Sequence, residues 1–429
     1  NGGRRRDFTI LHRINPFHMT FHRYYWTIAL TILSFGAKAQ EVVYDDFTMN
    51  PGYENMVYYS VDFGVAGTAN MASWDLAFDV RPMGGTARIN GGQGMSLFPA
   101  GPLSDWELIN DSFIDTAGDI EPFQNSTAYW SQGAFAEGSD GNFDLGWGVY
   151  DVVTHTVVSD RMYVISLPDG TWKKFALLSL ISGVYTFQFA NLDGSGFVED
   201  QVAKSNYLGK IHAFYNLTNQ EELDLEPSSE WDMLFLRYVE EIQPGVNYGV
   251  TGALTHPSVR VQELGGLTDP FVDGVLDTAA MTDSVNAVGW DWKSYAGGSF
   301  TVLDDRCYFM ETVTGSQWRV VFTGFDGSMT GNVELGKLLV SGTDVSENVS
   351  LSSSTNLFPN PAACETAVTV TSEASLLRVT VWGINGQKVK DINARGQSVE
   401  LSTTGMEPGM YLLQVESFSG SEVIRLTVQ

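Results

Sequence analysis

The histidines of this sequence are few and widely spaced. Beyond residue 39 the chain has only His155, His212 and His256, and no two of them stand at the spacing of metal ligands. The motifs that place catalytic groups together are also absent: His-Glu-x-x-His, Gly-x-Ser-x-Gly, the phosphate-binding loop and the dinucleotide fingerprint. Carboxylates are plentiful, but no pair of them stands out as the acid and base of a glycoside hydrolase. We therefore predict that the chain is not an enzyme.

Two further patterns concern binding. The segment from Asn191 to Gly196 has oxygen-bearing side chains at alternate positions and glycine at the sixth, as calcium loops do, but Val202 replaces the glutamate expected at the twelfth. We therefore expect a polar β-turn there. Tryptophan side chains could also line a carbohydrate groove by stacking, although core positions are the more common alternative in a strand-rich chain. The tryptophans concerned are Trp130, Trp147, Trp172, Trp290, Trp292 and Trp318.

The charge balance limits the partners of the chain. Its 429 residues include 24 Lys+Arg and 51 Asp+Glu, which gives a net charge of −27. This balance argues against nucleic acid and anionic membrane surfaces as partners, because phosphate recognition needs clustered basic residues. Hydrophobic residues make up 43% and charged residues 17%, so the chain can bury substantial cores. The 44 glycines and the aromatic content of 12% suit a β-rich protein with many turns.

Residues 19–39 have the form of a secretion signal. A short basic start precedes an apolar run over residues 26–35 that is too short to span a bilayer comfortably, and a small-x-small pattern follows. We expect cleavage after Ala39, which leaves Gln40 as the first residue. Residues 1–18 look like translated upstream sequence and are left out of the fold prediction. No later run reaches 18 apolar residues, so we expect no transmembrane segment after signal removal.

The middle of the chain contains an internal similarity between strand-forming segments. Trp74-Asp75 opens an apolar strand, and Trp231-Asp232 opens a similar one. Further on, a strand containing tyrosine, a turn containing glycine and a strand containing tryptophan follow one another twice in the same order. This repeat aligns Trp172 with Trp318. Ordered similarity of this kind indicates repeated supersecondary units. We therefore predict two tandem or interlocked β domains, at about 41–205 and 206–340.

The first of these segments resembles the HmuY family of secreted haem-binding proteins. The resemblance rests on Trp74–Asp79, Ala87–Gly92, Gly146–Asp151, Met162–Leu177 and Gly183–Ser195. It covers about 46–199 well and the second copy more loosely. It implies an all-β fold and haem held by axial His or Met ligands near hairpin ends. The candidate ligands here are His155, Met83, Met95 and Met162.

The C-terminal part has the pattern of a separate β module. A Ser-rich linker at 341–355 precedes residues 356–429, where short strands are divided by an Asn385-Gly386 hairpin turn and a Pro408-Gly409 turn. This pattern predicts an Ig-like sandwich of about seven short strands. The two cysteines, Cys307 and Cys364, fall in different predicted domains, so we expect free thiols.

This C-terminal module resembles the type A C-terminal sorting domain of the type IX secretion system. The residues that match the family pattern are Pro359, Asn360, Pro361, Gly386, Gly409 and Tyr411. The resemblance implies that the type IX translocon reads residues 356–429 and carries the protein to the outer surface of a Gram-negative bacterium or beyond it. The leading hypothesis is an exported ligand-binding protein, with haem implied by the family and a glycan as another ligand. The alternative is a structural or adhesive surface protein without a haem pocket.

Overall fold

The computed structural model describes residues 42–341, 356–364, 366–383, 387–417 and 420–429. Strands dominate these residues, and their one α-helix is the short α1 (Phe113–Thr116). The predicted all-β class is therefore confirmed. No helix in the described part of the chain has the length and apolarity to cross a membrane. Several predicted features lie outside these residues: the leader 1–18, the signal peptide 19–39 with Ala39 and Gln40, most of the linker 341–355, and Gly386.

Two outer sheets contain most of the strands between residues 43 and 341. The first outer sheet comprises β6 (Ser96–Pro102), β7 (Val149–Asp151), β8 (Thr156–Val158), β9 (Arg161–Ser166), β10 (Trp172–Ile181), β11 (Val184–Asn191) and β12 (Val198–Ala203). The second outer sheet comprises β1 (Val43–Thr48), β17 (Arg260–Leu264), β20 (Cys307–Glu311), β21 (Gln317–Phe325) and β22 (Asn332–Ser341). All strand pairs in both sheets are antiparallel.

Two inner sheets of four strands lie between the outer ones. The first inner sheet has the order β14 (Glu221–Leu223), β13 (His212–Asn216), β4 (Leu76–Asp79), β5 (Ala87–Ile89). The second has the order β16 (Val246–Thr255), β15 (Met233–Gln243), β2 (Asn55–Ser60), β3 (Gly64–Asn70). A small hairpin of β18 (Lys293–Ala296) and β19 (Ser299–Val302) forms its own sheet.

Single 3-10 turns lie between the strands. They are η1 (Pro51–Tyr53), η2 (Met71–Ser73), η3 (Gly91–Gln93), η4 (Leu103–Asp105), η5 (Ala117–Asp119), η6 (Ala134–Ala136), η7 (Lys204–Tyr207), η8 (Thr278–Ala280) and η9 (Gly327–Met329).

The alternation of side chains along the inner strands produces three stacked cores. On β15, Met233 enters the core shared with the second outer sheet, whereas Leu234 enters a core shared with the first inner sheet. On β4, Ala77 enters that same central core and Phe78 packs toward the first outer sheet. Because both faces of β4 and of the first part of β15 are buried, Leu76–Phe78 and Met233–Leu236 are apolar at every position rather than at alternate ones. Residues 43–341 therefore form four β layers.

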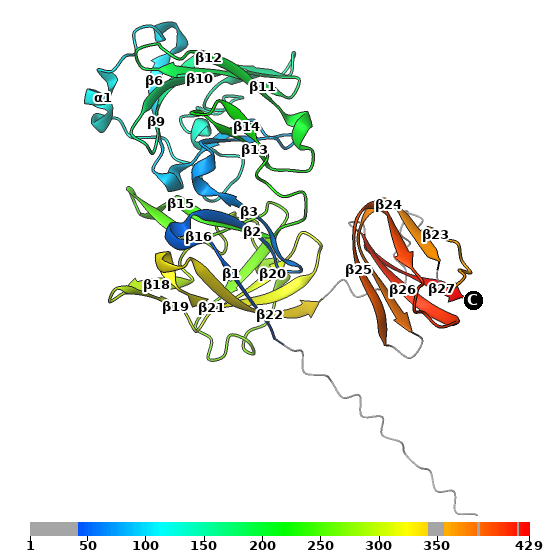
Figure 1. The fold of residues 1–429 in the computed structure, drawn as a ribbon. Coiled ribbons are helices and arrows are strands. Elements are labelled where there is room, and N and C mark those ends of the chain that lie inside the picture. The colour runs from blue at the N-terminus through cyan, green and yellow to red at the C-terminus, as the bar shows by residue number, and fades with distance from the viewer. Residues whose placement is uncertain (1–41, 342–355, 365, 384–386, 418–419) are drawn as a thin grey trace, which may run out of the picture. The chain divides into compact units, whose positions relative to one another are not determined.

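The strands pair across the predicted domain boundary. β1 pairs with β22 and β2 pairs with β15, so the first strands of the chain complete sheets built from residues after 231. In turn β13 pairs with β4. Figure 1 shows β1 and β2, in blue, beside the yellow β22 and the green β15. The division at 205/206 therefore does not separate two sets of sheets. Of the two predicted arrangements, the strand pairing is interlocked and not tandem.

The two Trp-Asp motifs occupy equivalent positions in the inner sheets. The Asp75 carboxylate accepts the Leu217 N–H at 2.7 Å, and the Asp232 carboxylate accepts the Val61 N–H at the same distance. Each aspartate N–H also bonds to the neighbouring strand, to the carbonyl of a buried tyrosine. Both indoles are buried. The carboxylates thus bond to backbone N–H groups that follow the end of a paired strand.

Strand register corrects one predicted alignment. Phe175 lies opposite Tyr163, and Val320 lies opposite Tyr308. Lys174 is therefore the counterpart of Arg319, one position away from the alignment of Trp172 with Trp318. The turns before these strands have equal lengths, and the error arose because the tryptophan is the first residue of β10 but the second residue of β21.

The two cations that register brings into correspondence, Lys174 and Arg319, both hold loops. The Lys174 ammonium donates to the carbonyls of Trp106 at 2.9 Å and Ile109 at 3.4 Å. Arg319 donates to the carbonyls of residues 270, 273 and 274 at 2.7 to 2.9 Å. Both side chains are buried. Each cation therefore fixes the irregular segment that follows β6 or β17, because its hydrogen bonds satisfy carbonyls that no strand pairs.

The C-terminal module is a sandwich with fewer and longer strands than predicted. Its strands are β23 (Asn356–Phe358), β24 (Ala367–Gly383), β25 (Lys388–Ser402), β26 (Gly409–Ser417) and β27 (Gly420–Val428). β24 pairs with β25 at both its ends, with β23 over its first residues and with β26 over its last. Two predicted short strands are thus one bent strand around a core that includes Val370 and Val379. Cys307 and Cys364 are free, as predicted.

Candidate functional site

A cleft with a volume of about 1260 Å³ is lined mainly by loops that join the strands of the first outer and first inner sheets. Residues 82–86, between β4 and β5, form one part of its wall, and residues 124–139 form another. Val239 to Glu241 of β15, with Asn247 of β16, contribute from the second inner sheet. Pockets that bind drug-sized ligands usually have volumes of up to about 1,000 Å³, so the volume of this cleft is above their range. The cleft can therefore accept a sizeable ligand or several linked units of one.

Three rings form a row on the cleft lining. The Phe143 ring centroid lies 6.2 Å from that of Tyr150, and Tyr150 lies 6.2 Å from His155. The Tyr150 hydroxyl and His155 Nδ1 are 2.7 Å apart. Phe143 is 60% exposed, so the face of its ring is available to a ligand. Aromatic faces of this kind stack against other flat apolar surfaces.

The backbone that presents these rings adopts left-handed conformations. Phe143 has φ 74°, His155 has φ 56°, and Ser182, also on the lining, has φ 52°. Such conformations cost about 1–3 kcal/mol each in residues other than glycine. Hydrogen bonds hold them, since the Phe143 carbonyl accepts the Tyr150 N–H at 2.8 Å and the His155 N–H donates to the Asp151 carbonyl at 2.9 Å. The row is therefore positioned at an energetic cost, as is common at binding sites.

Carboxylates outnumber cations on the lining. Glu137, Glu240 and Glu241 line the cleft, and burial raises the pKa of the Glu240 carboxyl. A fourth carboxylate, Asp144, forms an ion pair with Arg161 at 2.9 Å. Burial is the largest single influence on the pKa of Asp144 and raises it, but its hydrogen bonds, that from Arg161 first, lower the pKa overall. The lining therefore has a negative character, which repels anionic ligands.

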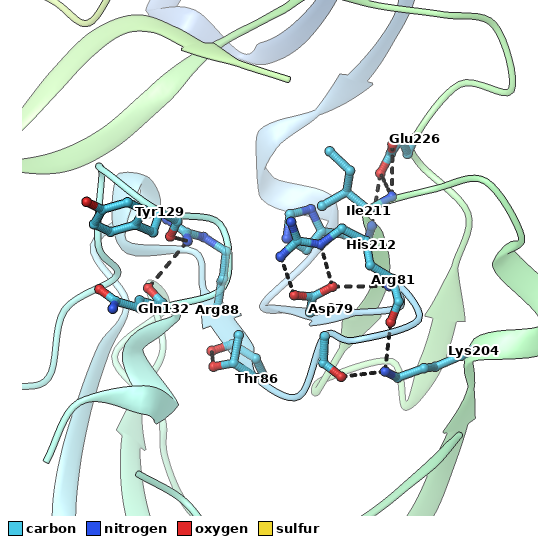
Figure 2. Close-up of polar contacts among 12 residues, drawn as sticks. Asp79, Arg81, Thr86, Arg88, Tyr129, Gln132, Lys204, Ile211, His212 and Glu226 are labelled. Atoms are coloured by element: carbon cyan, nitrogen blue, oxygen red, sulfur yellow. Dashed lines mark hydrogen bonds and ion pairs between the residues drawn. The ribbon is translucent and has the colours of Figure 1, made fainter. Parts of the chain in front are cut away.

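The one lysine of the lining, Lys204, is already engaged. Its Nζ donates to the carbonyls of Arg81 at 2.9 Å and Gly84 at 2.5 Å (Figure 2). Burial lowers the pKa of this ammonium. Lys204 therefore holds the β4–β5 loop in place, and its three donors have little capacity left for an anionic ligand.

Buried charges support the cleft walls (Figure 2). Arg81 forms a two-point ion pair with Asp79, with contacts of 2.9 and 2.5 Å. Arg88 donates to the carbonyls of Ser126 at 2.6 Å, Tyr129 at 3.2 Å and Gln132 at 3.5 Å. Burial lowers the pKa of Arg88 to about 10. Its guanidinium thus holds the wall formed by residues 124–139 through hydrogen bonds to carbonyl oxygens. None of these contacts is with a carboxylate.

The predicted haem ligands divide into two groups. His155 and Met83 both line the cleft, and Met83 is 96% exposed. Met95 belongs to the core of the first outer and inner sheets, and Met162 is equally buried on β9. The last two are corrections, because a thioether packed in a core cannot meet a ligand in the cleft.

Of the two alternatives for the tryptophans, core burial, which the sequence favoured, is confirmed for three of them. Trp130, Trp147 and Trp292 are core side chains, and the Trp147 indole donates to the Gly85 carbonyl at 2.6 Å. The remaining three, Trp172, Trp290 and Trp318, are partly buried. The exposed ring on the lining is instead Phe143, which the sequence analysis missed. The available signal was its position in a Gly- and Asn-rich turn, where a large apolar side chain has no core to enter.

Two other histidines and the calcium-like loop have structural roles. His212 and His256 pack against Trp130 and Trp231, and burial lowers the pKa of both imidazoles, that of His256 to about 4. In the Asn191–Gly196 segment the Asp193 carboxylate accepts bonds from the Ser195 N–H and hydroxyl, which is the predicted polar turn. No group of three or more metal-ligating side chains occurs among the described residues.

Five of the six predicted sorting residues lie among the described residues of the C-terminal module. The Asn360 side chain donates to the Arg425 carbonyl at 2.6 Å and accepts the Thr427 N–H at 2.9 Å, so the opening motif is joined to the last strand. Pro359 and Pro361 flank it, both after cis peptide bonds. Gly409 begins β26, and the Tyr411 hydroxyl donates to the Glu407 carbonyl at 2.8 Å.

The comparisons with known proteins identify the C-terminal module. Residues 356–429 match the family model described as the secretion system C-terminal sorting domain, which confirms that part of the prediction. No curated protein matches the chain. Among solved structures the chain is similar to PorZ, an essential bacterial surface component of the type IX secretion system of Porphyromonas gingivalis. That match has 11% identity and a TM-score of 0.19, and it covers 65% of this chain but only 41% of PorZ, so it carries no argument here. The HmuY resemblance stays a prediction.

Proposed function

We propose that this chain, exported by means of the sorting domain at 356–429, is a non-catalytic binding protein on the outer surface of a Gram-negative bacterium. Its ligand occupies the cleft beside Phe143, Tyr150 and His155. The observation that carries this proposal is the exposed Phe143 ring, held in a costly backbone conformation on the lining of a large cleft. Costly backbone conformations of this kind are concentrated at binding sites, which supports a ligand at this position.

The ligand class that suits the cleft is a neutral, hydroxyl-rich glycan. Sugar rings present apolar faces that stack on exposed aromatic rings such as Phe143. Their hydroxyl groups donate to carboxylates, and Glu137, Glu240 and Glu241 all line the cleft. The same carboxylates oppose ligands with net negative charge.

Haem fits these residues poorly. His155 is suited to coordination, because its Nδ1 is bonded to the Tyr150 hydroxyl and its Nε2 is left for a ligand. Porphyrin carboxylates, however, would meet Glu137, Glu240 and Glu241, while Lys204 is held by two carbonyls. We therefore derive no role for the chain through haem, and haem binding by His155 and Met83 is kept as an outcome of the test below.

The first experiment screens residues 41–429 against neutral glycans and measures the affinity of any hit by calorimetry. Phe143→Ala is expected to weaken binding roughly fivefold, which corresponds to about 1 kcal/mol for one aromatic contact. The matched control is Phe63→Ala, which removes a ring of almost equal exposure, 62%, from outside the cleft lining. Equal losses in both variants would refute the cleft as the site.

A haemin titration of the same protein separates the competing hypotheses. The proposal expects no saturable change in the Soret band. A saturable band that His155→Ala abolishes would instead establish haem binding and overturn the glycan proposal. Absence of binding in both experiments would favour the alternative, a structural or adhesive surface protein.

A further inference from the structure

A second, much smaller cavity lies within the central core, between the two inner sheets. Its volume is about 50 Å³. Trp74, Asn90 and His212 line it from the first inner sheet and its ends, and Tyr238 lines it from β15 of the second. Each of these four side chains is less than a tenth exposed. The cavity is thus lined from both sheets by large polar side chains, and Arg88, Arg237, Asn125 and Thr127 also belong to its lining.

Each of the four side chains presents an unsatisfied polar atom. Trp74 Nε1, Asn90 Oδ1, His212 Nε2 and the Tyr238 hydroxyl are buried and have no hydrogen-bond partner among the described residues. The orientation of Asn90 is determined by its amide nitrogen, which donates to the carbonyls of Met71 at 2.7 Å and Trp74 at 2.8 Å. A buried polar atom without a partner costs about 1–3 kcal/mol. Four such atoms around one cavity therefore point to a guest that bonds to them.

The chemistry of the four atoms selects the guest. The Trp74 indole can only donate, so the guest must accept a hydrogen bond. The Asn90 amide oxygen can only accept, so the guest must also donate one. A halide cannot donate, and an ammonium ion cannot accept. Water does both, and the Tyr238 hydroxyl and the His212 imidazole suit either direction.

We propose that this cavity holds a cluster of ordered water molecules that joins the two inner sheets. A water needs about 10–15 Å³ of such space, so there is room for about three to five. The waters bridge Tyr238 on one sheet to Trp74, Asn90 and His212 on the other. Asn125, Thr127 and Val239 line both this cavity and the large cleft, so the waters lie directly behind the cleft floor.

The direct test is a high-resolution crystal structure of residues 41–429, with a second crystal pressurised with xenon and a third soaked in bromide. The expected result is water density within hydrogen-bond distance of Trp74 Nε1 and Asn90 Oδ1, with neither xenon nor bromide in the cavity. Xenon at that position would show a dry apolar cavity, and an anomalous bromide peak would show an anion site. Either result overturns the proposal.

A variant tests the same inference in solution. Tyr238→Phe removes one anchor of a water cluster, so the urea midpoint of unfolding is expected to fall. In a dry cavity the same change would remove an unsatisfied hydroxyl, and the midpoint would rise. Tyr248→Phe, which alters an exposed side chain on the adjacent β16, is the matched control. A midpoint that rises or stays unchanged in Tyr238→Phe, relative to this control, refutes the water cluster.

Discussion

Glu226 makes the stability of this protein depend on pH in a direction opposite to that of most carboxylates. Its side chain is buried and accepts hydrogen bonds from the backbone N–H groups of Ile211 and His212 and from the Trp231 indole. Burial outweighs these bonds and raises the pKa of the carboxyl from 4.5 to about 7. The folded state therefore binds a proton more tightly than the unfolded state. Its contribution to stability is present below pH 4.5 and is lost as the pH rises through about 7.

The variant Glu226→Gln isolates this effect because its amide does not titrate. Each pKa unit corresponds to about 1.4 kcal/mol, so the difference between 4.5 and about 7 corresponds to about 3 kcal/mol. The free energy of unfolding of the variant, minus that of the original protein, should therefore rise by up to about 3 kcal/mol between about pH 4.5 and about pH 8. Urea unfolding of residues 41–429, followed by tryptophan fluorescence, measures this difference.

The control for this experiment is Glu199→Gln, which removes an exposed carboxylate from β12 and reports the effect of net charge alone. Asp232, whose pKa burial raises to about 6, titrates in all three proteins, so its contribution cancels. A difference for Glu226→Gln that stays constant over this pH range would refute the reasoning. A difference that instead falls as the pH rises toward 4.5, below this range, would show that the hydrogen bonds outweigh burial.

Three further predictions concern stability, loop order and export. Asp232→Ala should reduce the free energy of unfolding, measured by urea unfolding, up to about twice as much as Asp75→Ala, because it leaves the buried Val61 N–H and the part-buried Val313 N–H without their carboxylate partner, whereas Asp75→Ala leaves only the buried Leu217 N–H, and each such loss costs about 1–3 kcal/mol when buried; equal losses would contradict this. Lys174→Met should speed limited proteolysis between residues 103 and 112, whereas Lys173→Met, whose ammonium bonds to an asparagine side chain, should not; unchanged cleavage in both would show that Lys174 does not hold the loop. Deletion of 356–429 should abolish appearance of the protein at the cell surface in fractionation experiments, and intact export would refute the sorting role.

Local sequence patterns predicted the elements of this protein well. The all-β class, the polar turn at Asn191–Gly196 and the burial of both Trp-Asp motifs depend on short-range chemistry, namely strand propensity, turn residues and the affinity of a carboxylate for backbone N–H groups. The sorting domain was recognisable for the same reason, because its motif residues lie in a contiguous stretch of about 70 residues.

The candidate site was predicted only in part. His155 and Met83 were identified by residue type, and the structure places both on one cleft. Met95 and Met162 have the same chemistry but are buried, and residue type alone does not report burial. Phe143 was missed because its importance comes from exposure beside Tyr150, which depends on how the turn around it folds. The small cavity was invisible in the sequence, since its polar atoms come from four strands or strand ends far apart in the chain.

Composition and contiguous motifs are enough to establish that the chain is β-rich, acidic and equipped with a C-terminal sorting domain. The pairing of the strands, in contrast, depends on contacts between segments far apart in the chain. β1 and β2 pair with β22 and β15, which lie far along the chain, so the local pattern of apolar residues does not specify their partners. Which strands pair depends on the lengths of the loops and on the simultaneous packing of all four layers. That choice brings β15 against the first inner sheet, and with it creates both the cleft and the cavity behind it.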